Sequence, residues 1–302
     1  MPGKRVSKQS DPREIQDDQP GSMPTNDDEE EEWVRKTRSD ADQPRMWQRD
    51  IGAFRWIGEQ GAANTDDLRE LLGREAAGPT NQPGLLTKTR IRHIIEKRWL
   101  PAKMVYSDTM LGKKWVWPTK RALQRAGLPF ATHRPADVNL NHLHHCNRIR
   151  LYLERCYSGE GQWGSWESER MIELSKKDWK AKHKADPSIY IPSSYEMWHM
   201  PDAIWRFRDR GDTQDYQAYI EVEVSQKRPE KLNEIVLELA RHGTTWYYAD
   251  MDPRKGVYKG LMDALNTLTD RLLHYKENFW IYDLADPNTL VYHYEAPKKK
   301  SG

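Results

Sequence analysis

The stretch HMPDAIWRFRDRGDTQDYQAYIEVEVSQK, residues 199–227, decides the fold class of the second half of the chain. Apolar and polar residues alternate in 199–207 and again in 219–227, and a segment rich in Asp, Arg and Gly separates the two runs. Alternation with a period of two predicts β-strands, and the segment between them predicts a turn-rich loop. This part of the chain therefore contains a sheet.

The second of these strands carries two carboxylates on one face. Ile220 and Val222 point to one side of it, and Glu221 and Glu223 point to the other, because side chains alternate across a strand. Carboxylates on a buried face are costly unless they are paired. Asp202, on the neighbouring strand, is expected to approach them, and such a cluster can hold a divalent cation that polarises a phosphodiester and activates water. The alternative is an edge strand with solvated glutamates.

Several further elements surround these strands. A helix is expected over 140–157, a short strand over WESERMIEL with Glu167 and Glu169, and an irregular insertion over 175–198. The remaining periodic segments predict helices over 228–242 and 260–275 and strands over 245–248, 279–282 and 289–294. The chain as a whole is therefore expected to belong to the α+β class, with both helices and strands.

The middle of the chain is basic, although the net charge of the whole chain is only +2. Residues 46–135 contain 16 Lys and Arg against 8 Asp and Glu, whereas residues 1–45 contain 8 against 12. The remainder, 136–302, is slightly acidic, with 24 against 26. A basic excess confined to one part predicts contact with a polyanion through that part.

The order of elements in this basic part is typical of a winged helix-turn-helix. Apolar spacing predicts helices over 47–60, 64–73 and 87–99, then a hairpin built from 104–106 and 115–117, and a further helix from Thr119. In such a unit the third helix enters the major groove and the hairpin lies along phosphates. The alternative is a module that binds only protein.

The basic side chains of the third helix and the hairpin are the expected DNA contacts. One face of the helix over 87–99 is apolar and packs on its own domain, while the other face is basic. The expected DNA-binding residues are Lys88, Arg90, Arg92, Lys97 and Arg98 on the helix and Lys113 and Lys114 at the hairpin turn.

Several blocks between about Arg49 and Tyr258 resemble the replication-relaxation family of bacterial plasmids and other mobile elements. The pairing of Pro201-Asp202 with Glu221-x-Glu223, followed by a helix and a strand, also resembles the PD-(D/E)xK nuclease-like fold. The blocks that carry the resemblance are VWPTKRALQRAGLPF, NHLHHCNRIRLYLE, WESER, HMPDAIW, AYIEVEVSQK and TTWYYA. It implies a winged helix-turn-helix domain over 46–135 and a restriction-endonuclease-like α/β domain over 136–295.

The resemblance also assigns site residues. Asp202 and Glu221 match the metal ligands of active nuclease-like domains, and Glu169 lies where such folds often place another acidic residue. Glu223 occupies the position of the usual lysine, which Lys227 can replace from the strand–helix junction. The implied catalytic residues are thus Asp202, Glu221, Glu223 and Lys227, and the implied ligands of Mg²⁺ or Mn²⁺ are Glu169, Asp202, Glu221 and Glu223.

Two functions remain open. The first is a metal-dependent endodeoxyribonuclease that binds double-stranded DNA and acts in replication or relaxation of a mobile element. The second is a catalytically inactive replication accessory or transcriptional regulator whose nuclease-like domain forms a homodimer or recruits replication or mobilisation proteins. An adaptor that binds no DNA is a weaker third hypothesis.

The remaining features predict a cytoplasmic protein with no membrane partner. No run approaches the roughly 18–20 apolar residues of a membrane span, and the N-terminus lacks the apolar region of a secretory signal. Residues 1–45, with six acidic residues from Asp27 to Glu32, predict a disordered leader, and 296–302 a loose basic tail. Cys146 and Cys156 lie about 15 Å apart on one helix, which excludes a disulfide and leaves no cysteine zinc site. We expect His142, His144 and His145 to pack, cap or face solvent rather than bind metal.

Overall fold

A computed structural model describes residues 46–74, 84–268 and 276–294 of the chain. The residues from Met46 onward form one compact unit with mixed α and β structure. The predicted leader over 1–45 and the basic tail over 296–302 lie outside the described residues. No helix within the described ranges is long and apolar enough to cross a membrane.

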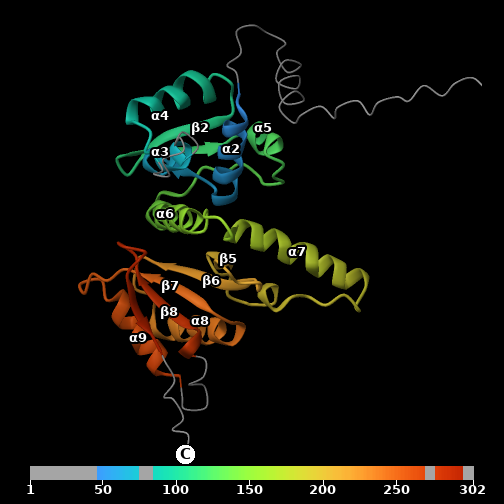
Figure 1. The fold of residues 1–302 in the computed structure, drawn as a ribbon, viewed down its shortest axis with the longest axis vertical. Coiled ribbons are helices and arrows are strands. Elements are labelled where there is room, and N and C mark those ends of the chain that lie inside the picture. The colour runs from blue at the N-terminus through green and yellow to red at the C-terminus, as the bar shows by residue number, and fades with distance from the viewer. Residues whose placement is uncertain (1–45, 75–83, 269–275, 295–302) are drawn as a thin grey trace, which may run out of the picture. The chain divides into compact units, whose positions relative to one another are not determined.

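The first half of the unit is a helical layer with a small sheet (Figure 1). The strands β1, β3 and β2 form a three-stranded antiparallel sheet in that order. In chain order the elements are α2 (Gln48–Gln60), β1 (Ala63–Asn64), α3 (Thr65–Arg74), α4 (Lys88–Ile94), a π-helical turn (Ile95–Trp99), β2 (Val105–Met110), β3 (Lys113–Pro118) and α5 (Lys120–Arg125). The helices and the hairpin predicted for this part are confirmed.

The apolar stripe of α4 explains why this helix packs as predicted. Ile91, Ile94 and Ile95 are buried, and Trp99 meets Phe54 of α2 edge-on, with ring centroids 5.0 Å apart. Thr87 begins the helix by accepting a hydrogen bond from the backbone N–H of Arg90 at 3.2 Å. The opposite face of α4 is thereby left to solvent.

The hairpin turn is tighter than the sequence indicated. Met110 pairs with Lys113, so that only Leu111 and Gly112 form the turn, both with positive φ. A two-residue turn of this kind matches the right-handed twist of the strands, and glycine at the second position relieves the strain. Lys113 and Lys114 therefore begin β3 and do not form the tip of the hairpin.

The second half of the unit contains a six-stranded mixed sheet. Its order is β4-β5-β6-β7-β8-β9, in which β6, β7 and β8 run parallel and the other neighbours run antiparallel. Its elements are α6 (Leu140–Cys156), β4 (Trp163–Ser168), α7 (Glu169–Ala185), β5 (Ala203–Arg208), β6 (Tyr216–Glu223), α8 (Pro229–His242), β7 (Thr245–Ala249), α9 (Val257–Asn266), β8 (Phe279–Asp283) and β9 (Leu290–His293). Short 3-10 turns cover Asp137–Asn139 and Ser193–Tyr195.

Helices cover both faces of this sheet (Figure 1). Ile220 and Val222 of β6 pack with residues of α6, whereas Tyr219 of the same strand packs with residues of α8 and α9. Both faces of β6 are therefore buried. The alternative of an edge strand with solvated glutamates is wrong, because β6 has a hydrogen-bonded neighbour on each side.

Two predictions for the segment before β5 need correction. Strand β4 ends at Ser168, so Glu169 is the first residue of α7 and not part of a strand. Helix α7 continues to Ala185, through the first part of the insertion that was expected to be irregular. The sequence did not indicate this helix because Ile172 is its only buried residue, so the helix has no apolar stripe. The charges at its ends are favourable, since Glu169 in the first turn and Lys182 to Lys184 in the last suit the helix dipole.

The limits of other predicted elements also shift. The strand expected over 199–207 begins only at Ala203, and α9 runs over Val257–Asn266 instead of 260–275, where 269–275 lie outside the described residues. The helix over 228–242 and the strands over 245–248, 279–282 and 289–294 are confirmed within two residues.

A buried polar network joins the end of α2 to α6 and β4. Asn147 of α6 accepts a hydrogen bond from Nε2 of Gln60 at 3.1 Å and donates to the carbonyl of Ala62 and to Asp67 at 3.0 Å each. The other side of the Gln60 amide accepts from Nε1 of Trp166 at 3.0 Å. These bonds fix the end of α2 beside the middle of α6 and the strand β4.

Candidate functional site

The predicted carboxylates meet in a cavity of about 490 Å³. Its wall includes four of the predicted site residues, namely Glu169, Asp202, Glu221 and Lys227. They come from the start of α7, the residue before β5, the C-terminal part of β6 and the loop before α8. The rest of the wall includes Gln60, Gly61, His133, His142, Arg170 and His199.

Glu221 is a buried carboxylate, with 3% of its surface exposed. Its Oε1 lies 2.6 Å from Nε2 of His199. Burial, and next the charge of Asp202, raise the pKa of Glu221 to about 7, although His199 and Lys227 oppose that rise. The site therefore concentrates negative charge in a place where water solvates it poorly.

Asp202 is held in place by groups on two elements. Its Oδ2 accepts a hydrogen bond from the backbone N–H of Val222 at 2.7 Å, and its Oδ1 lies 3.2 Å from Nε2 of His142. Its own carbonyl accepts from the backbone N–H of Glu169 at 3.0 Å, which fixes the start of α7 beside it. Glu169 is more exposed than Glu221, but partial desolvation of its carboxyl group, and then the charge of Asp202, also raise its pKa.

Glu223 does not line the cavity among the described residues. It is buried beside Lys227, with which it forms an ion pair, and its Oε2 accepts from the hydroxyl of Tyr247 at 3.4 Å. Lys227 itself does line the cavity. Glu223 therefore holds the lysine at the cavity wall, an arrangement that differs from its predicted place among the metal ligands.

Sequence reasoning missed three cavity groups. His142 and His199 pair with Asp202 and Glu221, and Arg170 adds a half-buried positive charge to the wall, bonded to the carbonyls of Gly58 and Ala131. The expectation that His142 only packs, caps or faces solvent did not include this pairing. The sequence contained one usable signal, because His199 lies three residues before Asp202 and so at the same end of β5.

Glu167, which was noted beside Glu169, has a structural position. Its carboxylate accepts from Nη1 of Arg206 at 2.7 Å, from Oγ of Ser175 at 2.9 Å and from the hydroxyl of Tyr195 at 3.1 Å. It is therefore saturated with donors outside the cavity.

The predicted DNA-binding residues divide into two groups. Lys88, Arg90, Arg92 and Lys97 are exposed, and none of the ion pairs among the described residues involves them. Arg98 instead forms an ion pair with Asp50, whose side chain is fully buried. In the hairpin, Nζ of Lys114 lies 2.6 Å from Glu96, and Nζ of Lys113 lies 3.8 Å from Asp66 and 3.3 Å from Nε2 of His144.

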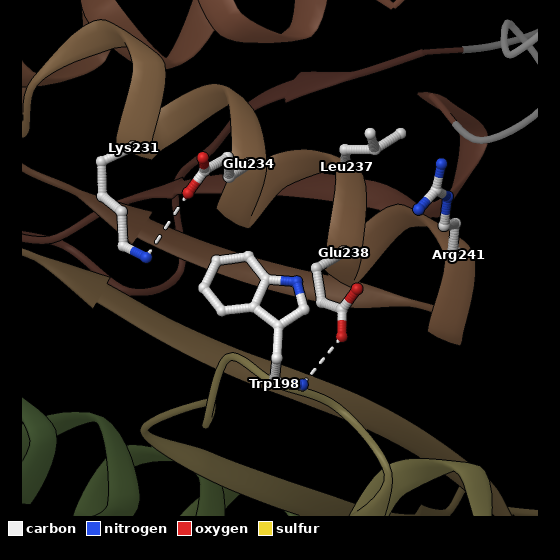
Figure 2. A pocket seen from close by; sticks show the side chains of 6 residues that line it. All are labelled: Trp198, Lys231, Glu234, Leu237, Glu238 and Arg241. Carbon is white, nitrogen blue, oxygen red and sulfur yellow. Dashed lines mark hydrogen bonds and ion pairs between the residues drawn. The ribbon is translucent and has the colours of Figure 1, made fainter.

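A second cavity of about 440 Å³ lies against α8 (Figure 2). Trp198 covers it, with Nζ of Lys231 at 4.1 Å from its ring centroid, and the backbone N–H of Trp198 donates to Glu238 at 2.9 Å. Glu234 pairs with Lys231 at 3.6 Å. Its two carboxylates, Glu234 and Glu238, both come from α8, whereas the first cavity gathers acids from three separate segments, so the first cavity is the candidate site.

Comparison with known proteins gives no relative of this chain. No protein-family model matches it, no curated protein matches it, and no solved structure matches it. The interpretation of the site therefore depends on its own geometry.

Proposed function

We propose that the protein is a metal-dependent endodeoxyribonuclease that binds double-stranded DNA through its first half and hydrolyses phosphodiester bonds at the cavity beside β6. The observation that carries this proposal is the meeting of Glu169, Asp202 and Glu221 with Lys227 in one cavity wall. Clustered carboxylates can hold a divalent cation for the hydrolysis of a phosphodiester, and a lysine beside them can stabilise the charge that develops on the phosphate.

The donors in the cavity fit Mg²⁺ or Mn²⁺. Both ions prefer carboxylate oxygens, and Glu169, Asp202 and Glu221 supply them from three elements fixed by backbone hydrogen bonds. Desolvation and the charge of Asp202 raise the pKa values of Glu221 and Glu169, so a bound cation would stabilise the charged forms of these acids. When bound, the ion supplies Lewis acidity toward the phosphate and lowers the pKa of a bound water.

The chain's own residues have separate tasks in this scheme. The N–H of Val222 orients Asp202, and His199 orients Glu221. Lys227 and Arg170 place positive charge at the wall, where a phosphate group enters. Glu223 acts as a positioning residue, because its carboxylate holds the ammonium of Lys227.

The first half supports a winged helix-turn-helix that binds duplex DNA. Three helices followed by a two-stranded hairpin occur there in the order of that fold, and α4 exposes Lys88, Arg90 and Arg92 opposite its apolar stripe. A helix that packs one face and presents Arg and Lys on the other suits the major groove. The role in replication or relaxation of a mobile element rests on the sequence blocks alone.

One observation favours the second candidate, a DNA-binding protein without catalysis. Asp202 pairs with His142, Glu221 with His199 and Glu223 with Lys227, so each of these acids already has a cationic partner from the chain. In that case the pairs stabilise the sheet, and the second half binds a partner or a second copy.

Cleavage of supercoiled plasmid separates the two candidates. The wild type is incubated with Mg²⁺ or Mn²⁺ beside Asp202→Asn and Glu221→Gln, and Glu238→Gln serves as a matched control because Glu238 is also a buried carboxylate but lies outside the cavity. Nicking by the wild type and the control, absent in both site variants, supports the nuclease. Duplex binding without cleavage by the wild type supports the second candidate.

A further inference from the structure

A second set of metal-binding groups lies at the edge of the cavity. His142 and Cys146 are one turn apart on α6, on the side that faces Asp202. Sγ of Cys146 lies 3.8 Å from the ring nitrogens of His142, and Nε2 of His142 lies 3.2 Å from Oδ1 of Asp202. One ligand atom from each of the three residues lies within 4.8 Å of the other two.

We propose that His142, Cys146 and Asp202 bind a thiophilic divalent transition-metal ion such as Zn²⁺. Zn²⁺ binds imidazole nitrogen, thiolate sulfur and carboxylate oxygen at about 2.0–2.3 Å, so a tetrahedral site places these atoms roughly 3.4–3.6 Å apart. The observed distances of 3.2 and 3.8 Å lie close to that spacing, and the ligand atoms of the third pair, Cys146 and Asp202, lie within 4.8 Å of each other. Small side-chain rotations therefore suffice to form the site.

The surroundings of the three ligands also suit a metal. Cys146 is 7% exposed and packs among apolar residues of α6 and the sheet, which protects a bound thiolate from oxidation and solvent. The Val222 N–H bond to Oδ2 of Asp202 leaves Oδ1 directed at His142, and such orienting bonds are typical of carboxylate ligands. His142 also lines the open cavity, so a fourth position remains accessible to water.

The donor set distinguishes this site from the one proposed for cleavage. Thiolate and imidazole select Zn²⁺ or Co²⁺ over Mg²⁺, whereas Glu169 and Glu221 offer only oxygen. The two sites share Asp202, but neither needs the other to exist. Binding to the thiol and imidazole releases protons, so the affinity increases with pH.

Cobalt titration of the full chain tests this proposal. Protein freed of metal with a chelator is titrated with Co²⁺, and a cobalt–thiolate charge-transfer band at one ion per chain is expected in the near ultraviolet. Cys146→Ser should abolish the band, and Zn²⁺ should displace it from the wild type. His142→Ala should weaken binding by more than about 10-fold, since even residues that only orient a ligand contribute about 10–100-fold.

The exposed thiol on the same helix provides the matched control. Cys156→Ser should keep the band, because Cys156 is exposed and the proposed ligand set does not include it. Glu221→Gln should also keep it while losing plasmid cleavage, which separates this proposal from the nuclease. Near-ultraviolet circular dichroism confirms that each variant is folded. No band in the wild type, or a band that persists in Cys146→Ser, overturns the proposal.

Discussion

Nε2 of His199 lies 2.6 Å from Oε1 of Glu221, so the central buried acid of the cavity is bonded to an imidazole from outside the sheet. Asp202 has the same kind of partner, because Nε2 of His142 lies 3.2 Å from its Oδ1. Burial acts to lower the pKa of His199, but the hydrogen bond to Glu221 and the charges of Glu221 and Asp202 together outweigh it and raise that pKa. The histidines thus supply positive charge that a metal ion can replace.

Replacing His199 with Ala should make the fold depend on metal. The change leaves buried Glu221 without its closest donor and should lower the free energy of unfolding by about 1–3 kcal/mol in the absence of metal. Added Mn²⁺ should recover most of this loss, because the ion neutralises Glu221 directly. Thermal unfolding with and without Mn²⁺ measures both effects.

His242→Ala is the matched control for that experiment. His242 pairs with buried Glu238 at 3.5 Å on α8, away from the cavity. Its loss should also destabilise the chain, but Mn²⁺ should not restore the stability. Equal shifts of the melting temperature with Mn²⁺ in both variants would contradict a cation site at Glu221.

Glu221→Gln and Glu223→Gln should have different effects, although both residues are buried on the same face of β6. Glu221 lines the cavity and Glu223 pairs with Lys227. Glu221→Gln should abolish cleavage, whereas Glu223→Gln should reduce it and retain Mn²⁺ binding, because only the position of Lys227 changes. Cleavage rates and Mn²⁺ titration by calorimetry check this; loss of Mn²⁺ binding in Glu223→Gln would restore Glu223 as a ligand.

The alternation of β6 was enough to place Glu221 and Glu223 on one face, and the stripe of α4 was enough to identify its buried side. These features are local, since one residue's neighbours along the chain determine its direction. The pairing of His142 with Asp202 was not predictable in this way, because sixty positions separate them and the fold alone brings α6 to the end of β5. The four-residue spacing of His142 and Cys146 was visible, but its third ligand was not.

The same limit explains Arg98 and Glu169. Arg98 looked like a member of the basic face because it follows Lys97, yet the π-helical turn over Ile95–Trp99 directs it toward Asp50. Glu169 looked like a strand residue, but the strand ends one position earlier. Both errors concern the end of an element, where sequence patterns have the least information.

Replacing Arg90 and Arg92 with Ala should weaken duplex binding and its dependence on salt. Each phosphate contact contributes about 1 to the slope of log affinity against log salt, so the double variant should lose about 2 if both residues reach phosphates. Lys180→Ala with Lys184→Ala removes the same charge from exposed positions of α7 and should leave the slope unchanged. Fluorescence anisotropy between 50 and roughly 200 mM salt measures the slopes. Equal slopes in the two double variants would exclude α4 as the DNA-binding face.

Arg98→Ala should act on stability rather than on DNA contact. Its partner Asp50 is fully buried, and breaking a buried ion pair costs about 3–5 kcal/mol. The cost should be near the lower value, because Nε1 of Trp99 at 3.0 Å and the backbone N–H of Trp47 at 2.9 Å still donate to Asp50. Urea unfolding measures the loss, and the salt slope of binding at low temperature should stay at the wild-type value; a slope reduced by about 1 would return Arg98 to the DNA-binding face.

Asn147→Leu should uncouple the two halves of the chain. Asn147 receives a hydrogen bond from Gln60 and donates to Asp67 and to the carbonyl of Ala62, all in buried positions. Leucine fills a similar volume but leaves these polar groups without their partner, and each unsatisfied group costs about 1–3 kcal/mol. Since the network joins α2 to α6, the wild type should unfold in one transition, whereas the variant should unfold in two, with the half that contains α2 melting first. Calorimetry resolves the transitions, and tryptophan fluorescence follows the unfolding of both halves.

Asn288→Leu provides the control, because Asn288 accepts a hydrogen bond from the hydroxyl of Tyr152 in an exposed position. A single transition in Asn147→Leu would mean that apolar packing, such as that of Leu151 of α6 against the hydrophobic core of the first half, is sufficient to couple the halves.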